Sequence, residues 1–477
     1  MTSGTEFRDR ACLVLGLGAF GGGAGCARQL VREGARVTVT DLRQAGELQE
    51  ACAALAGLPV EWALGGHSAE LFASAPLVVV NPAVPSTSPW LDFARQRGCI
   101  VTSDAELGIE RAARWPALAV TGTHGKSSCA ALAHHLLERA FPGSVLAGNL
   151  GGSVFERVGE LGPLGRLVLE LSSFQTERLQ APPGWPHVAL LTGLGADHLD
   201  RHGDLSQYHL AKRRILASQD TEGLVVLPAG DAAAEDWVGH ARGRIAWFSA
   251  APLPPGRDGW ELAGGVLRER HAGRVRELAD ATALPFPEPY RAASAVAAVA
   301  GARALGLATE VVAARLRSFP GLPHRMEPIP SPAGLKFVDN GVATHPDPTT
   351  AALTWIQGPV VLLAGGKDKG LGLEALAAVA RNCRALHLFG AGGARLFQVL
   401  GGRAAGAVHH SGCRSAIEAA VAGLRPGETL LFSPSFSSYD EFRNFRERAG
   451  LFREICANAG TAADRTTVTR AGQEPSQ

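Results

Sequence analysis

Lysine is scarce in this chain of 477 residues. Five of its 46 basic residues are lysine, at positions 126, 212, 336, 367 and 369, and the remainder are arginine. A lysine kept among so many arginines is a candidate for chemistry that arginine cannot perform. Its compact ammonium fits a phosphate site, and its neutral amine can be covalently modified. Chance retention stays the alternative for each lysine, and nothing else distinguishes Lys336.

Long apolar runs, paired cysteines and an excess of one charge are also missing. No apolar run reaches the length of a membrane span, and the N-terminus has no signal-peptide core. None of the eight cysteines forms a C-x-x-C pair, which argues against a zinc site or a disulfide framework. The net charge of +1 gives no reason to expect nucleic acid or an anionic membrane as a partner. We therefore expect a reduced, cytoplasmic protein and a monomer.

The length and the strand pattern predict three α/β domains, because 477 residues are too many for one core. Apolar strands alternate with helical patterns, as in doubly wound parallel sheets. We predict a Rossmann-like domain at 1–106, a central P-loop ATPase-like doubly wound domain at 107–321, and a C-terminal Rossmann-like α/β domain at 322–477. The polar stretch from about residue 461 predicts a disordered tail.

The central stretch of the chain has the design of a phosphate-binding loop. An apolar run, 117–120, is followed by Thr-Gly-Thr-His-Gly-Lys-Ser-Ser at 121–128 and then by an apolar helical pattern. Glycines let backbone N–H groups close around phosphate oxygens, and the helix N-terminus adds positive potential. Lys126 can reach the outer phosphates, and the Ser127 hydroxyl can hold Mg²⁺. A strand–turn–helix without function carries Gly-Lys-Ser by chance often enough, but seldom the whole string.

A second glycine-rich turn lies near the N-terminus. The strand at 11–15 leads into Gly16-Leu17-Gly18-Ala19-Phe20-Gly21, which fits G-x-G-x-x-G, and a later strand ends at Asp41. This pattern by itself predicts a dinucleotide site. Gly22 and Gly23 add room for a phosphate. A further strand, 77–80, ends at Asn81 in a proline-rich loop.

Two polar groups follow strands of the central domain. Glu170 lies within the apolar run 167–171, where a carboxylate is costly unless it is paired or bound to a metal. His198 lies in Asp197-His-Leu-Asp-Arg201, ahead of a predicted helix, 205–218, that carries Lys212. Glu170 and His198 suit a second Mg²⁺, although imidazole is an unusual ligand for so hard an ion. If the phosphate loop were absent, Glu170 could be read as a solvent-facing glutamate at the end of a strand, and the segment around His198 as an ordinary surface loop.

The loop at 121–128 resembles the ATP loop of the Mur ligases, the amino-acid-adding enzymes of peptidoglycan synthesis, and of their folylpolyglutamate synthetase relatives. The resemblance covers nearly the whole chain. Four blocks favour the branch that adds glutamate to UDP-N-acetylmuramoyl-L-alanine: 170–175, 197–201, 365–369 and 433–445. In this family the first domain binds the uridine diphosphate of the substrate, so the resemblance implies a UDP-substrate site there and not a nicotinamide site.

The resemblance implies a role for each matching position. The catalytic residues are expected to be Lys126, Glu170, His198 and Lys212. The implied ATP-binding residues are Gly122, Thr123, His124, Gly125, Lys126, Ser127, Ser128, Arg291, Arg325 and Asn340. Those for the UDP-substrate are Gly18, Ala19, Phe20, Asp41, Asn81, Asn149 and Ser172. Those for glutamate are Thr344, Lys369, Ser438, Tyr439 and Phe445. Two Mg²⁺ ions are expected on Ser127, Glu170, His198 and a carbamylated Lys212.

The family chemistry is an acyl-phosphate ligation with ATP, and three departures bear on it. Val342 stands where a lysine is usual, and losing that cation weakens dianion binding by about 1–3 kcal/mol unless His345 or Lys367 replaces it. Tyr290-Arg291-Ala292-Ala293-Ser294 replaces His-Asn-x-x-Asn on the adenine side, where Arg291 can stack on a purine. His124 replaces a usual asparagine. The alternatives are a ligase for another amino acid, such as L-glutamate, or a non-catalytic relative that binds the uridine nucleotide.

Overall fold

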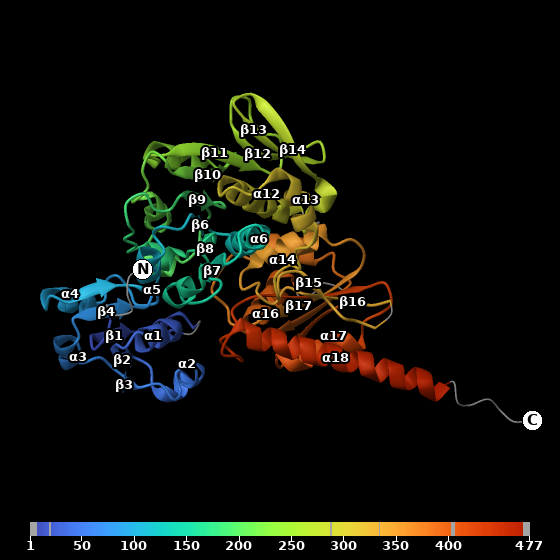
Figure 1. Cartoon of the computed structure of the whole chain (residues 1–477). Helices are drawn as coiled ribbons and strands as arrows, with labels where there is room; N and C mark the ends of the chain where they lie inside the picture. Colours follow the sequence, from blue (N-terminus) through green and yellow to red (C-terminus); the bar gives the residue numbers. More distant parts are fainter. Residues whose placement is uncertain (1–6, 19–20, 287–288, 333, 402–405, 471–477) are drawn as a thin grey trace, which may run out of the picture. The chain divides into compact units, whose positions relative to one another are not determined.

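The computed structural model describes residues 7–18, 21–286, 289–332, 334–401 and 406–470. The chain divides into two compact units, 1–320 and 321–477. The first unit contains two sheets and the second contains one (Figure 1). Among the described residues, no helix is both long enough and apolar enough to cross a membrane.

The first sheet has five parallel strands in the order β3-β2-β1-β4-β5. The strands are β1 (Ala11–Leu15), β2 (Arg36–Asp41), β3 (Val60–Leu64), β4 (Leu77–Val80) and β5 (Ile100–Thr102). The helices are α1 (Gly22–Arg32), α2 (Gln49–Ala53), α3 (Ala69–Ser74), α4 (Pro89–Gln96) and α5 (Asp104–Arg111), with a 3₁₀ turn, η1 (Ala45–Glu47). The strand order reverses between β1 and β4, so the loops that follow these two strands diverge and leave a crevice at the carboxyl edge.

The second sheet has nine strands in the order β14-β13-β12-β11-β10-β9-β6-β8-β7. The strands are β6 (Ala117–Thr121), β7 (Val145–Gly148), β8 (Leu167–Glu170), β9 (Val188–Leu191), β10 (Leu224–Pro228), β11 (Arg244–Ser249), β12 (Gly259–Ala263), β13 (Val266–His271) and β14 (Arg274–Asp280). The helices are α6 (Lys126–Glu138), α7 (Val154–Arg157), α8 (Ser173–Thr176), α9 (Leu199–His202), α10 (Leu205–Arg213), α11 (Ala232–Glu235), α12 (Pro289–Ala304) and α13 (Thr309–Arg317). The 3₁₀ turns are η2 (Val158–Glu160), η3 (Arg214–Leu216), η4 (Asp236–His240) and η5 (Ala281–Ala283).

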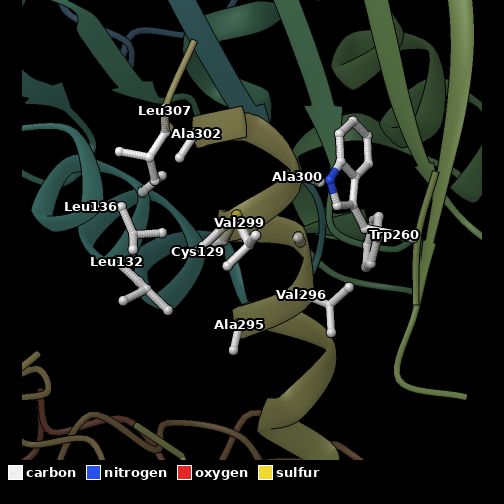
Figure 2. Packing of buried hydrophobic residues seen from close by; sticks show 14 of the residues in the cluster. Cys129, Leu132, Leu136, Trp260, Ala295, Val296, Val299, Ala300, Ala302 and Leu307 are labelled. Carbon is white, nitrogen blue, oxygen red and sulfur yellow. The ribbon is translucent and has the colours of Figure 1, made fainter. Parts of the chain in front are cut away.

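Strand β6 is buried on both faces, which explains its uninterrupted apolar sequence. Leu118 and Val120 point into a core shared with α6 and α12, while Ala117 and Ala119 point into the core on the opposite face. Figure 2 shows Leu132 and Leu136 of α6 on one side of α12 and Trp260 of β12 on its other side. This packing holds the start of α6 at the carboxyl end of β6, where the phosphate loop lies.

The second unit contains a six-stranded sheet in the order β15-β16-β20-β17-β18-β19, parallel except for the β15–β16 pair. The strands are β15 (Glu327–Ile329), β16 (Lys336–Asp339), β17 (Val360–Gly365), β18 (Ala385–Phe389), β19 (Ala407–His410) and β20 (Thr429–Ser435). The helices are α14 (Pro346–Trp355), α15 (Glu374–Ala380), α16 (Gly390–Val399), α17 (Cys413–Ala422) and α18 (Phe445–Arg470). Apolar clusters fill both faces of this sheet.

Three details bear on the sequence-based expectations. Helix α18 continues to Arg470, through part of the stretch from about residue 461 where a disordered tail is expected, and that tail stays a prediction. The predicted helix 205–218 is α10 followed by the 3₁₀ turn η3. The antiparallel strands β12–β14 were not expected within a doubly wound sheet. The boundary at residue 106 stays a prediction.

Candidate active site

Two glycines shape the loop between β6 and α6. Gly122 has φ +146° and Gly125 has φ +80°, both in the region that favours glycine. A Cβ on Gly122 would lie 2.1 Å from Thr192 Oγ1, and one on Gly125 would lie 2.7 Å from Ser294 Oγ. The loop therefore needs glycine at both positions for conformation and for space.

Two lysines meet at one carbonyl of this loop. Lys126 Nζ donates to the carbonyl oxygens of Gly122, at 2.8 Å, and Thr123, at 2.9 Å. Lys212 Nζ donates to the same Gly122 oxygen at 2.7 Å. The Lys212 side chain is 1% exposed, and burial together with the nearby Lys126 ammonium holds its pKa well below the ordinary 10.5. The arrangement favours the neutral amine of Lys212.

Tyr208 lies beside Lys212 on α10. Lys212 Nζ is 4.5 Å from the centre of the Tyr208 ring, and the Tyr208 hydroxyl donates to Thr123 Oγ1 at 3.3 Å. Burial raises the pKa of Tyr208 to about 12, so the phenol stays protonated. The tyrosine thus links the helix that carries Lys212 to the phosphate loop.

Glu170 ends β8 as a buried carboxylate that is 1% exposed. Its Oε1 accepts from Asn149 Nδ2 at 2.9 Å. Its Oε2 is also buried and finds no hydrogen-bond partner among the described residues. An unsatisfied buried carboxylate oxygen is unfavourable, so the site is suited to receive a cation.

His198 stands at the start of α9 with φ +51°, a conformation rare for a residue other than glycine. Its Nε2 lies 3.3 Å from Asp197 Oδ2, and its ring centre lies 4.8 Å from that of Phe174. The Asp197 carboxylate also favours the charged form of Lys212, as does Glu170. The charges of Glu170, Asp197 and Lys126 thus all act on Lys212, so the four side chains lie in one neighbourhood.

The glycine-rich turn of the first sheet packs against the loop that follows β4. A Cβ on Gly18 would lie 2.6 Å from Asn81 Nδ2, and the N–H of Leu17 donates to Asp41 Oδ2 at 2.9 Å. Burial would raise the pKa of Asp41, but its hydrogen bonds with Arg43 and Leu17 outweigh this effect and lower it. Asn81 lines a pocket that also reaches Gly148 of β7 and Gln175 of α8.

Of the two extra glycines, Gly23 has a packing reason, whereas a Cβ on Gly22 would meet no atom within 4 Å. A Cβ on Gly23 would lie 2.3 Å from the Leu17 carbonyl oxygen. Gly23 therefore permits α1 to approach the turn that follows β1 closely, where the sequence pattern had suggested room for a phosphate.

In the second unit, Thr344 and Lys369 line one pocket together with Ser435 and Phe436. Ser438 is buried, whereas Tyr439 is 58% exposed. Phe445 lies at the start of α18, with its ring centre 6.1 Å from that of His324. Thr344 and Lys369, two of the residues predicted to bind glutamate, thus share a pocket. All residues that line this pocket belong to the second unit.

Comparison with known proteins gives a consistent result for all three parts of the chain. Three family models match: the Mur ligase MurD-like N-terminal domain at residues 10–103, the Mur ligase middle domain at 120–251, and the Mur ligase glutamate ligase domain at 324–436. The UDP-N-acetylmuramoylalanine–D-glutamate ligase of Roseiflexus sp. is 34% identical over 461 residues, covering 94% of this chain and 99% of that protein. The enzyme of the same name from Geobacter metallireducens is 34% identical over 463 residues, covering 96% and 99%.

The chain belongs to the Mur ligase family. The crystal structure of UDP-N-acetylmuramate-alanine ligase MurC from Thermotoga maritima shares the fold, with a TM-score of 0.62 at 18% identity over 94% of this chain and 99% of that one. The resemblance and the three-domain α/β fold class expected from the sequence are confirmed.

Mur ligases are ATP-dependent and use Mg²⁺, and the residues present fit both. Glu170 Oε2 is buried without a hydrogen-bond partner among the described residues, as expected for a metal ligand. Ser127 lies in the first turn of α6, beside the glycines whose backbone conformation opens the loop. Oxygen donors of this kind suit Mg²⁺.

Several predicted ligand contacts are occupied by partners within the protein. Asn149 Nδ2 donates to Glu170, and Ser172 caps α8 by accepting from the N–H of Gln175. Asn340 is buried, with Nδ2 donating to Ser433 Oγ and Oδ1 accepting from the N–H of Met326. The Arg291 guanidinium lies 4.0 Å from the centre of the Phe286 ring. Ala19 and Phe20 lie outside the described residues.

The sequence analysis gave no individual role to Tyr208, Asp197 or Arg201, although it singled out the block 197–201. Asp197 and Arg201 bracket the block that carries His198, so their proximity in the sequence was the available signal. Tyr208 lies four residues before Lys212, which on a helix places the two on one face.

A cluster of His324, Glu327 and Asp339 has metal-ligand character but is an ion-pair network. His324 Nδ1 lies 2.7 Å from Asp339 Oδ2, and the Arg453 guanidinium bridges Asp339 and Glu327. Because the Arg453 guanidinium already pairs with both carboxylates, we assign no metal to this cluster.

Proposed function

We propose that this Mur ligase joins D-glutamate to UDP-N-acetylmuramoyl-L-alanine, with conversion of ATP to ADP and phosphate, in the cytoplasmic synthesis of peptidoglycan precursors. The observation that carries this proposal is the match to D-glutamate ligases at up to 34% identity over more than nine-tenths of the chain. The phosphate loop with its two lysines and the unpaired Glu170 oxygen support a catalytically competent enzyme.

The reaction must activate a carboxylate, because a carboxylate resists attack by an amine. The alanyl carboxylate attacks the γ-phosphorus of ATP, giving an acyl phosphate and ADP. The amine of glutamate then attacks the acyl carbon, and the tetrahedral intermediate expels phosphate. Lys126, which now bonds to carbonyls of its own loop, turns to the β- and γ-phosphates and offsets the charge that develops there.

The proposed metal ligands are Ser127 and Glu170 for one Mg²⁺, and Glu170, His198 and carbamylated Lys212 for a second. When bound, Mg²⁺ neutralises charge on the phosphoryl oxygens. The lowered pKa of Lys212 supports carbamylation, since only a neutral amine adds to CO₂, forming the N–C bond and releasing a proton. The product is an anionic oxygen ligand that arginine cannot readily provide.

The substrate sites are proposed to lie where the sequence motifs place them. Gly18, Asp41 and Asn81 would contact the UDP-substrate, together with Asn149 and Ser172 once these release their internal partners. Thr344, Lys369, Ser438, Tyr439 and Phe445 would surround glutamate. His124, Arg325, Arg291 and Asn340 would contact ATP.

The decisive experiment measures ADP release with UDP-N-acetylmuramoyl-L-alanine, ATP and Mg²⁺, with D-glutamate and L-glutamate supplied separately. Release that requires D-glutamate is expected. Release with L-glutamate alone would assign the enzyme to the other enantiomer. L-glutamate is tested because Val342 stands where a lysine is usual, which changes the expected contacts of the amino acid. The absence of release with either, from folded protein that binds the uridine nucleotide, would contradict the proposal.

Carbamylation is tested by ¹³C NMR after incubation with ¹³C-bicarbonate. The wild-type protein is expected to show a carbamate carbon signal, and the Lys212→Arg variant is expected to lack it. A signal of equal strength in both proteins would place the carbamate on another amine.

A further inference from the structure

The side chain of Arg201 joins two loops that belong to different sheets. Its Nη1 donates to the carbonyl oxygen of Ala83 at 3.0 Å, and its Nη2 donates to those of Pro82, at 3.2 Å, and Val84, at 2.9 Å. The side chain is 13% exposed. One largely buried guanidinium therefore donates to three consecutive backbone carbonyls.

The loop at one end of these bonds is part of the proposed UDP-substrate site. Residues 82–84 follow Asn81, whose Oδ1 accepts from the N–H of Ala83 at 2.9 Å. Asn81 lies against Gly18 of the glycine-rich turn, and Asn81 and Pro82 line the pocket shared with Gly148 and Gln175. The position of these carbonyls thus sets the position of Asn81.

The loop at the other end carries the proposed metal ligand His198. Arg201 lies in α9, three residues after His198. The Phe174 ring contacts both side chains, since its centre is 5.0 Å from the Arg201 guanidinium carbon and 4.8 Å from the centre of the His198 ring. Arg201 and His198 are therefore held by one aromatic side chain.

Glu177 fixes the orientation of the guanidinium. Arg201 Nη2 donates to Glu177 Oε1 at 2.5 Å, and Nε donates to Oε2 at 3.4 Å. The same carboxylate accepts from Ser86 Oγ at 2.6 Å. Arg178, the next residue, donates to the Val84 carbonyl at 2.9 Å. A planar guanidinium spreads five N–H donors over three nitrogens that reach these acceptors, whereas an ammonium has three donors on one nitrogen.

We infer that Arg201 is a positioning residue that holds the Asn81–Val84 loop in register with the His198 loop, so that the acyl end of the UDP-substrate meets the phosphate site. The inference rests on the proposed function and adds a residue to it. Arg201 acts in this inference through the two loops, since the partners of its guanidinium are the carbonyls of 82–84 and the Glu177 carboxylate.

The test is the Arg201→Lys variant, which keeps the positive charge but loses the planar guanidinium and its separate N–H donors. We expect KM for the UDP-substrate to rise and kcat to fall, with a combined loss of about 10–100-fold in kcat/KM for that substrate. The dissociation constant of ADP is expected to stay within about twofold of wild type. The matched control is Arg414→Lys, since Arg414 is more than half exposed and forms surface ion pairs with Glu418 and Glu454.

Two results would overturn the inference. One is a KM for the UDP-substrate that stays unchanged while the apparent kcat falls only in proportion to the fraction of folded protein. This is the result expected if Arg201 contributes to stability alone. The other is an equal loss of affinity for ADP. If Arg201→Lys does not fold, Glu177→Gln removes the charge that orients the guanidinium and is judged by the same criteria.

The proposed function and this inference can fail separately. An inactive wild-type protein would contradict the proposed function. The inference is then judged by calorimetric binding of UDP-N-acetylmuramoyl-L-alanine, which Arg201→Lys is expected to weaken at least about tenfold. An active wild-type enzyme whose kinetics are insensitive to Arg201→Lys would contradict the inference alone.

Discussion

At the scale of single residues, the proposed active site concentrates buried ionisable side chains around one loop. Lys212 and Glu170 are each 1% exposed, and Lys126 and Lys212 donate to the same carbonyl oxygen. Burial favours the neutral amine of Lys212, whereas an ionised carboxylate as deeply buried as that of Glu170 costs free energy unless it is paired or bound to a metal. Phosphate bound at Lys126 and Mg²⁺ bound at Glu170 would supply the opposite charges.

Glu170→Gln separates the metal-binding role from stability. The substitution keeps the shape and the acceptor for Asn149 but removes the charge, so we expect a loss of about 10–100-fold in kcat/KM and a higher Mg²⁺ requirement. The melting temperature is expected to stay equal or to rise, because Oε2 has no hydrogen-bond partner among the described residues. The measurements are ADP release across a Mg²⁺ titration and thermal unfolding. An unchanged Mg²⁺ requirement would contradict the role.

The scarcity of lysine made all five lysines candidates, and it was the phosphate loop and the family resemblance that singled out Lys126 and Lys212. These sequence features could not show that both bond to Gly122, since this depends on α10 packing against the loop. The role implied for Asn149 was a contact with the nucleotide, whereas its amide bonds to Glu170 in this structure. Side-chain partners of this kind are decided by tertiary packing.

At the scale of elements, the phosphate loop depends on glycine for conformation as well as for size. The positive φ angles of Gly122 and Gly125 are unfavourable for residues with a side chain. In addition, Ser294 of α12 lies close to Gly125 and leaves no room for a Cβ there. The sequence pattern predicted a strand, a loop and a helix here, and β6 and α6 confirm it.

Gly125→Ala is expected to destabilise the protein by about 1–2 kcal/mol, because an alanine at φ +80° is strained. The added Cβ also approaches Ser294, so the affinity for ADP is expected to fall. Gly159→Ala is the control: Gly159 has no positive φ, and a Cβ there would meet no atom within 4 Å, so its stability is expected to be unchanged or slightly higher. Chemical denaturation and calorimetric ADP binding measure both variants. Equal effects in the two would contradict the argument.

Strands β18 and β19 carry a pair of histidines that makes the second unit sensitive to acid. His387 Nδ1 lies 3.0 Å from His410 Nε2. Burial, with contributions from His410 and Arg384, lowers the pKa of His387 from 6.5 to about 4. The unfolded chain therefore binds a proton near pH 6.5 that the folded chain refuses until about pH 4, so stability falls as the pH drops through this window.

His387→Gln is expected to remove part of that loss. Because the imidazole is only half-buried, solvent screening limits the effect to about 1–2 kcal/mol between pH 6.5 and 4. His409→Gln serves as the control, since this exposed neighbour on β19 bonds to the Gly390 carbonyl. The measurement is the free energy of unfolding as a function of pH. A profile for His387→Gln parallel to that of wild type would contradict the assignment.

At the scale of the whole molecule, no hydrophobic cluster among the described residues spans the two units. Four clusters lie wholly within residues 1–320, and two lie wholly within 321–477. Each unit thus has the apolar core that independent folding requires.

A fragment of residues 321–477 is accordingly expected to fold by itself. We expect a monomeric species with cooperative thermal unfolding and circular dichroism of a mixed α/β protein. The fragment 1–320 is expected to bind UDP-N-acetylmuramoyl-L-alanine, because the proposed residues for that substrate lie within it. An aggregated fragment, or one that melts without cooperativity, would contradict the division.

The sequence by itself determined the family, the α/β fold class, the phosphate loop and the identity of the charged residues, because these are encoded in local patterns and in composition. Tertiary structure alone decided which of these residues meet. It placed Lys212 on the Gly122 carbonyl, left one oxygen of Glu170 unpaired among the described residues, and tied Arg201 to the loop after β4. Such contacts join positions up to about 120 residues apart, so they depend on strand order and helix packing, which no local pattern contains.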